Sequence, residues 1–118
     1  MSIGLKRAYD APAKSDGCRV LVDRIWPRGI AKDDLRVDAW LKDLAPSAGL
    51  RKWFGHDPKK WDEFKKRYAR ELEQRSDALE QLAERAKAGR VTLVFGAKDT
   101  EHNNAVALKE QLDLRLTR

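Results

Sequence analysis

Two short apolar runs in the chain predict the central strands of a sheet. "CRVLVD", which begins at Cys18, is rich in β-branched side chains, and this composition favours a buried strand. "VTLVF", which begins at Val91, is apolar apart from its threonine, as is typical of a strand covered on both faces. The roughly alternating segment "IGLKRAY", which begins at Ile3, predicts a first strand at the edge of the sheet.

Apolar side chains at steps of three and four residues predict the helices. The clearest stripe of this kind consists of Trp61, Phe64, Tyr68 and Leu72. Asp57 lies four residues before Trp61 and can accept hydrogen bonds from the free amides of a first turn. Pro58 suits the first helical position, where a missing N–H sacrifices no bond. We therefore expect a helix to begin here, with His56 in the turn before it.

Four further segments have helical signals. Ser47 favours the start of a short helix that Gly55 closes. A helix over 33–45 is predicted by the apolar positions Leu35, Trp40, Leu41 and Leu44. A helix from Ser76 to just before Gly89 is predicted by Leu79, Leu82 and Ala86. A last helix, from about Glu101, is predicted by the inner row Ala105, Leu108 and Leu112.

The order strand, helices, strand, helix predicts an α/β fold. We expect a single compact domain over 1–118, in which helices flank a small, mainly parallel sheet of three or four strands. A chain of 118 residues has no room for a second independent core. The tail 114–118 is expected to fray.

The composition predicts a cytoplasmic protein without a metal or a cofactor. Cys18 is the single cysteine, which excludes an internal disulfide and fits a reducing compartment. The longest apolar run, over 91–97, is far shorter than the about 20 residues of a membrane span, and no secretion signal precedes Ile3. No group of cysteines, histidines and carboxylates has zinc spacing.

Charged and polar residues follow both central strands directly. Because parallel strands end at the same edge of a sheet, the two sets are expected to face each other across a polar pocket. The first set is Asp23, Arg24 and Arg28, and the second is Lys98, Asp99, His102, Asn103 and Asn104.

This pocket suits a phosphate or carboxylate group. Arg24, Arg28 and Lys98 would hold the anion beside the amides of a helix start, with Asn103 and Asn104 next to it and Trp26 on the wall. Gly96 permits a close approach of the backbone. If the site is catalytic, Asp23 or Asp99 would orient the ligand or accept a proton, and His102 would transfer one.

A structural interpretation of the same charges stays open. Asp23 or Asp99 would then pair with Arg24, Arg28 or Lys98 and lock the loops together. Asp99 would also cap the last helix. A pocket and such a lock can coexist.

Four stretches of the chain resemble the YeaO-like bacterial family, a domain of unknown function (number 488). They are "DGCRVLVDRIWPRG", "WLKDLAPS", "LRKWFGHDP" and "VTLVFGAKDTEHNNA", and they lie within 6–108. The resemblance implies a compact α/β domain and no established activity. It also implies that longer relatives have a cysteine at the place of Phe95 and Cys-His-Arg at the places of Asn103, Asn104 and Ala105. Thiol or metal chemistry of those relatives therefore does not carry over.

Three functions remain compatible with the sequence, which does not decide whether the protein is an enzyme. The first is binding of, or action on, a small anionic ligand in the pocket. The second is nucleic-acid binding, which the net charge of +6 and the pI near 9.6 favour. The third is a stress-related interaction domain without catalysis, whose four tryptophans leave scope for a homo-oligomer interface. The basic surface of the second consists of Arg51, Lys52, Lys59, Lys60, Lys66, Arg67 and Arg70.

Overall fold

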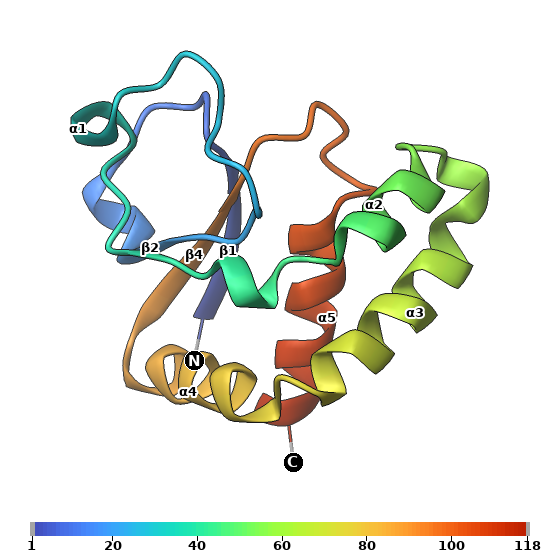
Figure 1. The fold of residues 1–118 in the computed structure, drawn as a ribbon. Coiled ribbons are helices and arrows are strands. Elements are labelled where there is room, and N and C mark those ends of the chain that lie inside the picture. Colours follow the sequence, from blue (N-terminus) through green and yellow to red (C-terminus); the bar gives the residue numbers. More distant parts are fainter. Residues whose placement is uncertain (1, 118) are drawn as a thin grey trace.

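Four parallel strands form the sheet of the structure, a computed structural model that describes residues 2–117 (Figure 1). The strands are β1 (Ser2–Arg7), β2 (Cys18–Leu21), β3 (Ala39–Trp40) and β4 (Arg90–Phe95). Their order across the sheet is β1-β4-β2-β3, and every neighbouring pair is parallel. The predicted α/β class and parallel sheet are confirmed, and so is the edge position of the first strand.

Five helices surround this sheet in the described part of the chain. They are α1 (Lys32–Leu35), α2 (Ala48–Phe54), α3 (Trp61–Glu73), α4 (Ser76–Ala88) and α5 (Asn104–Leu116). Figure 1 shows α2, α3 and α5 on one side of the sheet and the short α1 on the other. No helix within 2–117 is long and apolar enough to cross a membrane.

The strands divide their apolar side chains between two cores of unequal size. Val20 and Val22, together with Leu93, face the larger core, in which α2 to α5 cover the sheet. Leu21 and Val94 point the other way, into a small cluster that also contains Leu35 of α1. This division follows from the alternation of side chains along a strand. The smaller core is completed by partly buried side chains, among them Trp26, Ile30 and Trp40.

The predicted helix signals act as expected at α2 and α3. The Ser47 hydroxyl accepts a hydrogen bond from the Leu50 amide, and Gly55 ends α2 in the left-handed conformation. Asp57 and Pro58 open a 3-10 turn that leads directly into α3, whose aromatic stripe lies in the larger core. The predicted bounds of α4 are also confirmed.

The single helix predicted over 33–45 is wrong. The helix α1 ends at Leu35, because Arg36 adopts a left-handed conformation with φ of 53°. The chain then forms β3 beside β2, and a 3-10 turn follows at Lys42–Leu44. The Trp40 indole donates to the carbonyl of Asp23 at 2.7 Å, so a contact distant in sequence outweighs the local helical spacing.

The last helix differs from the prediction at both ends. It begins at Asn104 rather than near Glu101, because the preceding residues form a separate turn. It then continues to Leu116, so it includes part of the tail expected to fray. Arg118 lies outside the described residues.

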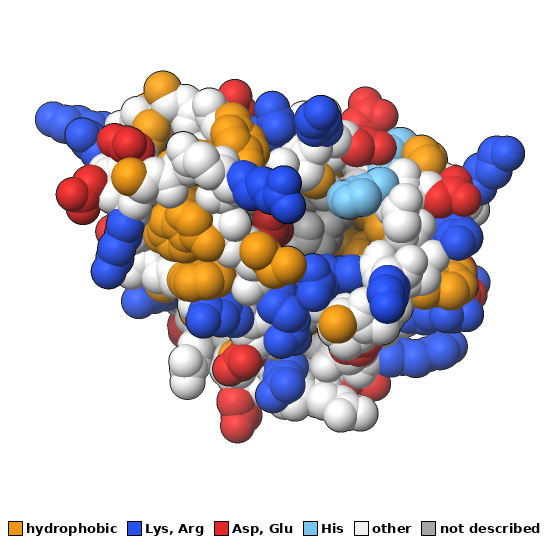
Figure 2. Space-filling model, turned by 45° about the horizontal axis from the view of Figure 1, so that its top comes forward, with side chains coloured by type: hydrophobic (Ala, Val, Ile, Leu, Met, Phe, Trp, Pro, Cys, Tyr) orange, Lys and Arg blue, Asp and Glu red, His pale blue; other side chains and the backbone are white. Residues whose placement is uncertain are grey.

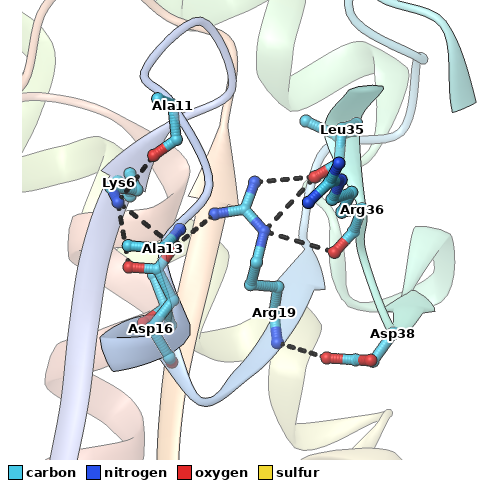
Figure 3. A network of polar contacts seen from close by, with 9 residues as sticks. Lys6, Ala11, Ala13, Asp16, Arg19, Leu35, Arg36 and Asp38 are labelled. Carbon is cyan, nitrogen blue, oxygen red and sulfur yellow. Dashed lines mark hydrogen bonds and ion pairs between the residues drawn. The ribbon is translucent and has the colours of Figure 1, made fainter. Parts of the chain in front are cut away.

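A buried ion pair connects β2 to its neighbours on the side of the smaller core (Figure 3). The Asp16 carboxylate accepts from Arg19 Nη1 at 2.7 Å, from Lys6 Nζ at 2.9 Å and from the Ala13 amide at 3.0 Å. The Arg19 guanidinium also donates to the carbonyl of Leu35. Asp16 is only 6% exposed and Arg19 only 4%. The network therefore joins β1, β2 and the end of α1.

The ion pair also sets the acid stability of the protein. Burial alone would raise the pKa of Asp16, but the hydrogen bonds from Ala13, Lys6 and Arg19 outweigh it and lower the pKa to about 2. A carboxyl group whose folded pKa is lowered stabilises the fold above its unfolded pKa of about 4. This stabilisation is lost as the pH falls from about 4 toward about 2.

We predict that Asp16→Asn lowers the free energy of unfolding at neutral pH by about 3 kcal/mol, because Arg19 then keeps a buried charge without its partner. The difference from the wild type should shrink between pH 4 and pH 2. Urea denaturation across this range measures both effects. Asp10→Asn, at an exposed position, is the control and should leave stability unchanged. A difference that stays constant with pH would contradict the role of the ionised carboxylate.

Candidate functional site

A cleft of about 920 Å³ lies beside the carboxyl ends of β2 and β4. Its walls come from four parts of the chain: the loop 23–28, the segment 46–56 that contains α2, Phe64 of α3, and the start of α5 with the preceding Gly96 and Ala97. Figure 2 shows this region as a hollow with Lys and Arg side chains and a histidine around it. The place agrees with the general rule for ligand sites in parallel sheets.

Asp23 joins the loop 23–28 to Gly96 and to the start of α5. One carboxylate oxygen accepts from the Gly96 amide at 2.8 Å, and the other accepts from the Asn104 side-chain amide at 3.0 Å. The same Asn104 nitrogen donates to the carbonyl of Val22 at 3.0 Å. Added to the bond from Trp40, these contacts connect the ends of β2 and β4 with β3 and α5. A Cβ at position 96 would lie 3.2 Å from the carboxylate, so glycine suits this close approach.

The surroundings of Asp23 favour its protonated form. Burial raises the pKa of this carboxyl above its ordinary value, although the hydrogen bonds from Gly96 and Asn104 oppose the change. The nearby Arg51 and His56 also oppose it. Both oxygens of this carboxyl group accept hydrogen bonds within the fold, so Asp23 is a structural junction.

Basic side chains line the cleft around this junction. They are Arg24, Arg28, Arg51, Lys52 and His56. The Nε atoms of Arg24 and Arg51 are buried, and neither has a hydrogen-bond partner within residues 2–117. Buried donors in proteins are normally paired, so two unpaired guanidinium donors in one cleft are unusual.

Apolar residues form the floor and one wall of the same cleft. Phe54 and Phe64 are stacked with their ring centroids 4.3 Å apart, and both contribute to the lining. Trp26 lies edge-to-face against Trp40 at 5.3 Å, and its indole donates to the carbonyl of Ile30 at 2.7 Å. The cleft therefore combines unpaired positive donors with the partly exposed aromatic surface of Trp26.

His56 reaches the cleft through a strained turn. Gly55 and His56 both adopt the left-handed conformation, with φ of 54° and 56°. This conformation is easy for glycine and unfavourable for histidine. The predicted turn at His56 is confirmed, and it directs the chain from the end of α2 toward α3.

The structure brings together six of the nine candidate residues from the sequence. The cleft is lined by Asp23, Arg24, Trp26, Arg28, Asn103 and Asn104. Lys98, Asp99 and His102 do not contribute to its lining. Lys98 is exposed to solvent. The His102 ring lies edge-on to Trp61 at 5.4 Å, and its Nδ1 is 3.0 Å from the Asp99 carboxylate.

Asp99 closes a turn instead of capping α5. Its carboxylate accepts hydrogen bonds from the amides of Glu101 and His102, and these bonds lower the pKa of Asp99 below its ordinary value. The cap of α5 is Asn103, whose side-chain oxygen accepts from the Val106 amide at 3.0 Å. This turn explains why, of the charged and polar residues predicted after β4, only Asn103 and Asn104 line the cleft.

The predicted lock between loops exists with different partners. Asp23 joins the loops through a backbone amide and an asparagine, whereas we expected a pairing with Arg24, Arg28 or Lys98. Sequence reasoning also missed the contribution of Arg51 and Lys52 to the cleft, because it assigned both to an outer basic surface. The available signal was the motif "LRKWFGHDP", which carries the family resemblance and contains both residues.

Comparison with known protein families identifies the family of this chain. A model of the family described as "Inactive DUF488-N3 subclade" matches residues 2–118. The chain belongs to this family. It is 44% identical over 112 residues to the uncharacterized protein YeaO of Escherichia coli K12, which covers 95% of this chain and 97% of that protein. The expected membership of the YeaO-like family is thus confirmed.

Mycobacterial proteins are similarly close to the chain. Uncharacterized proteins of Mycobacterium tuberculosis and Mycobacterium bovis are each 43% identical over 113 residues, covering 96% of this chain and 95% of theirs. No solved structure matches the chain. Within residues 2–117, no group of three or more histidine, cysteine and acidic side chains could hold a metal ion.

We predict that Asn104→Ala raises the pKa of Asp23 further, because burial is then less opposed by hydrogen bonding to the ionised form. The variant should also lose about 2 kcal/mol of unfolding free energy at neutral pH, since the carbonyl of Val22 and the carboxylate each lose a donor. A group with a raised folded pKa loses its stabilising contribution as the pH rises. The loss should therefore grow as the pH rises above about 4.

Carboxyl NMR titration measures the pKa, and urea denaturation measures the stability. Gln81→Ala, an exposed position on α4, is the control for both. A pKa of Asp23 that stays the same in Asn104→Ala would show that the asparagine does not stabilise the ionised carboxyl.

Proposed function

We propose that the protein binds a small anion in this cleft without catalysing a reaction. The anionic group, a phosphate or a carboxylate, would be held by Arg24 and Arg51. The observation that carries this proposal is the pair of buried Nε donors that lack a partner among the described residues. A small rotation of each side chain would open its Nε to the cleft, where an oxygen of a bound anion would supply the missing acceptor.

The chemistry of the guanidinium group fits this role. Arginine stays charged at all physiological pH values, and its planar set of donors matches the oxygens of a phosphate or carboxylate. Hydrogen bonds between charged groups are about twice as strong as neutral ones. The exposed Arg28 and Lys52 add positive charge to the same cleft and would attract an anion toward it.

Several features support binding without catalysis. Asp23 is the one acidic residue among those lining the cleft, and both its oxygens accept hydrogen bonds within the fold. Asp99 and His102, the other candidates for proton transfer, pair with each other away from the cleft. Cys18 lies at the opposite end of β2, and the family description uses the word "inactive".

The contacts of the predicted basic surface support nucleic-acid binding less well than the cleft supports binding of a small anion. The ammonium of Lys60 donates to the carbonyl of Trp53 at 2.8 Å. Arg67 lies 4.0 Å from the centre of the Trp53 ring and also pairs with Glu63. Arg51 and Lys52 belong to the cleft. Four of the seven residues proposed for this surface are thus engaged elsewhere.

We predict that inorganic phosphate raises the melting temperature of the wild type and has no such effect on Arg24→Gln/Arg51→Gln. A ligand that binds the folded state alone, at ten times its Kd, stabilises by about 1.4 kcal/mol. The matched control is Lys59→Gln/Lys66→Gln, which removes the same charge from two exposed positions outside the cleft. Differential scanning calorimetry at constant ionic strength measures the effect.

The control also separates the two candidate functions. If the phosphate effect is the same in both double variants, the cleft is not the anion site. A short single-stranded DNA whose binding is weakened by Lys59→Gln/Lys66→Gln and by salt, but not by the cleft variant, would instead favour nucleic-acid binding.

A further inference from the structure

We propose that the anion bound by this cleft carries its phosphate or carboxylate on an aromatic or heteroaromatic ring. This inference rests on the proposed function, because the anionic group would occupy Arg24 and Arg51. It goes further by assigning the rest of the cleft to a flat apolar body.

The size of the cleft supports a ligand larger than a bare anion. Its volume of about 920 Å³ lies within the usual range of about 300 to 1,000 Å³ for small-molecule sites. The guanidinium donors occupy only part of the lining. The remainder includes the half-buried Trp26, together with the small exposed edges of the core residues Phe54 and Phe64. Aromatic faces and edges of this kind favour the stacking or edge-to-face contacts of another ring.

Ile25 is an apolar side chain that the fold itself leaves uncovered. It lies on the cleft and is 63% exposed, more than any other large apolar side chain among residues 2–117. Its neighbour Trp26 packs against the smaller core, whereas Ile25 belongs to neither core. A ring bound between Ile25 and Trp26 would remove this apolar surface from water.

The loop that carries these residues is fixed in advance. The Tyr9 hydroxyl donates to the carbonyl of Arg28 at 3.1 Å, and the Trp26 indole donates to the carbonyl of Ile30. The bond from Trp40 to the carbonyl of Asp23 fixes the beginning of the loop. A wall held in this way loses little conformational freedom when a rigid ring binds. Rigid rings therefore gain more from this cleft than flexible chains of the same area.

The test compares pairs of ligands that differ only in the ring. Phenyl phosphate is compared with methyl phosphate, and benzoate with acetate, by isothermal titration calorimetry on the full chain. The ring should tighten binding by at least about tenfold in the pair whose anionic group the arginines prefer. Benzyl alcohol, which has the ring without the charge, should bind at least about tenfold more weakly than the better aromatic anion.

Two single variants assign the effect to the apolar wall. Ile25→Ser should reduce the preference for the ring by about threefold or more, because it removes an apolar contact from the cleft mouth. Leu114→Ser is the matched control: this leucine is 59% exposed on α5 and does not line the cleft. It should leave the preference unchanged. Both positions are exposed, so neither substitution should prevent folding.

The possible results separate the two proposals. Equal affinities for phenyl and methyl phosphate, and for benzoate and acetate, would overturn the proposal of an aromatic ligand. The proposed anion site would then remain. An absence of binding by all four anions would overturn the anion site itself. Benzyl alcohol binding as tightly as the aromatic anions would also contradict the anion site. If Ile25→Ser and Leu114→Ser reduce the preference for aromatic ligands equally, that preference does not arise in the cleft.

Discussion

The carboxyl group of Asp23 meets the Gly96 amide and the Asn104 side chain where β2, β4 and α5 converge. Each of these elements ends or begins with backbone groups that its own pattern of bonds does not satisfy. A single side chain with two acceptor oxygens joins them, and the Trp40 indole adds β3 through the carbonyl of the same residue. The position of one side of the cleft depends on this junction, because 23–28, Gly96 and the start of α5 all leave from it.

Two partly or fully buried carboxyl groups in this fold have opposite acid-base behaviour. Asp16 has two cationic partners, and these, with the Ala13 amide, lower its pKa to about 2 despite its burial. Asp23 has neutral hydrogen-bond donors and no ion-pair partner within the described residues, so burial dominates and raises its pKa. The set of hydrogen bonds to the ionised form, and not burial alone, decides the direction. The fold thus lowers the pKa of a carboxyl group near one end of β2 and raises that of another at the opposite end.

Local patterns were sufficient for the elements that are stabilised locally. The aromatic stripe of α3, the caps of α2 and the apolar runs of β2 and β4 all follow from spacing and from turn chemistry. The segment 33–45 did not follow, because its apolar spacing is helical while its stabilising contacts come from β2 and Asp23. A left-handed arginine after α1 gives no signal in the sequence.

The candidate site was predictable to the same extent. The rule that ligands bind at the carboxyl ends of parallel strands led to Asp23, Arg24 and Asn104, which line the cleft. The rule does not account for His102. The backbone amide of His102 bonds to Asp99 and its ring packs against Trp61, and no sequence motif indicates either contact. It also omitted Arg51, since only the tertiary docking of α2 brings that side chain to the sheet edge.

The division of the apolar side chains into two unequal cores has a consequence for how this family can diverge. Trp26 completes the smaller core and at the same time forms a wall of the cleft. A substitution that reshapes the cleft at this position therefore also changes the packing behind the sheet. Its neighbour Ile25 touches the cleft and neither core. A substitution at Ile25 can therefore change the selectivity of the cleft for its ligand without disturbing either core. A substitution at Trp26 changes the selectivity and the stability of the fold together.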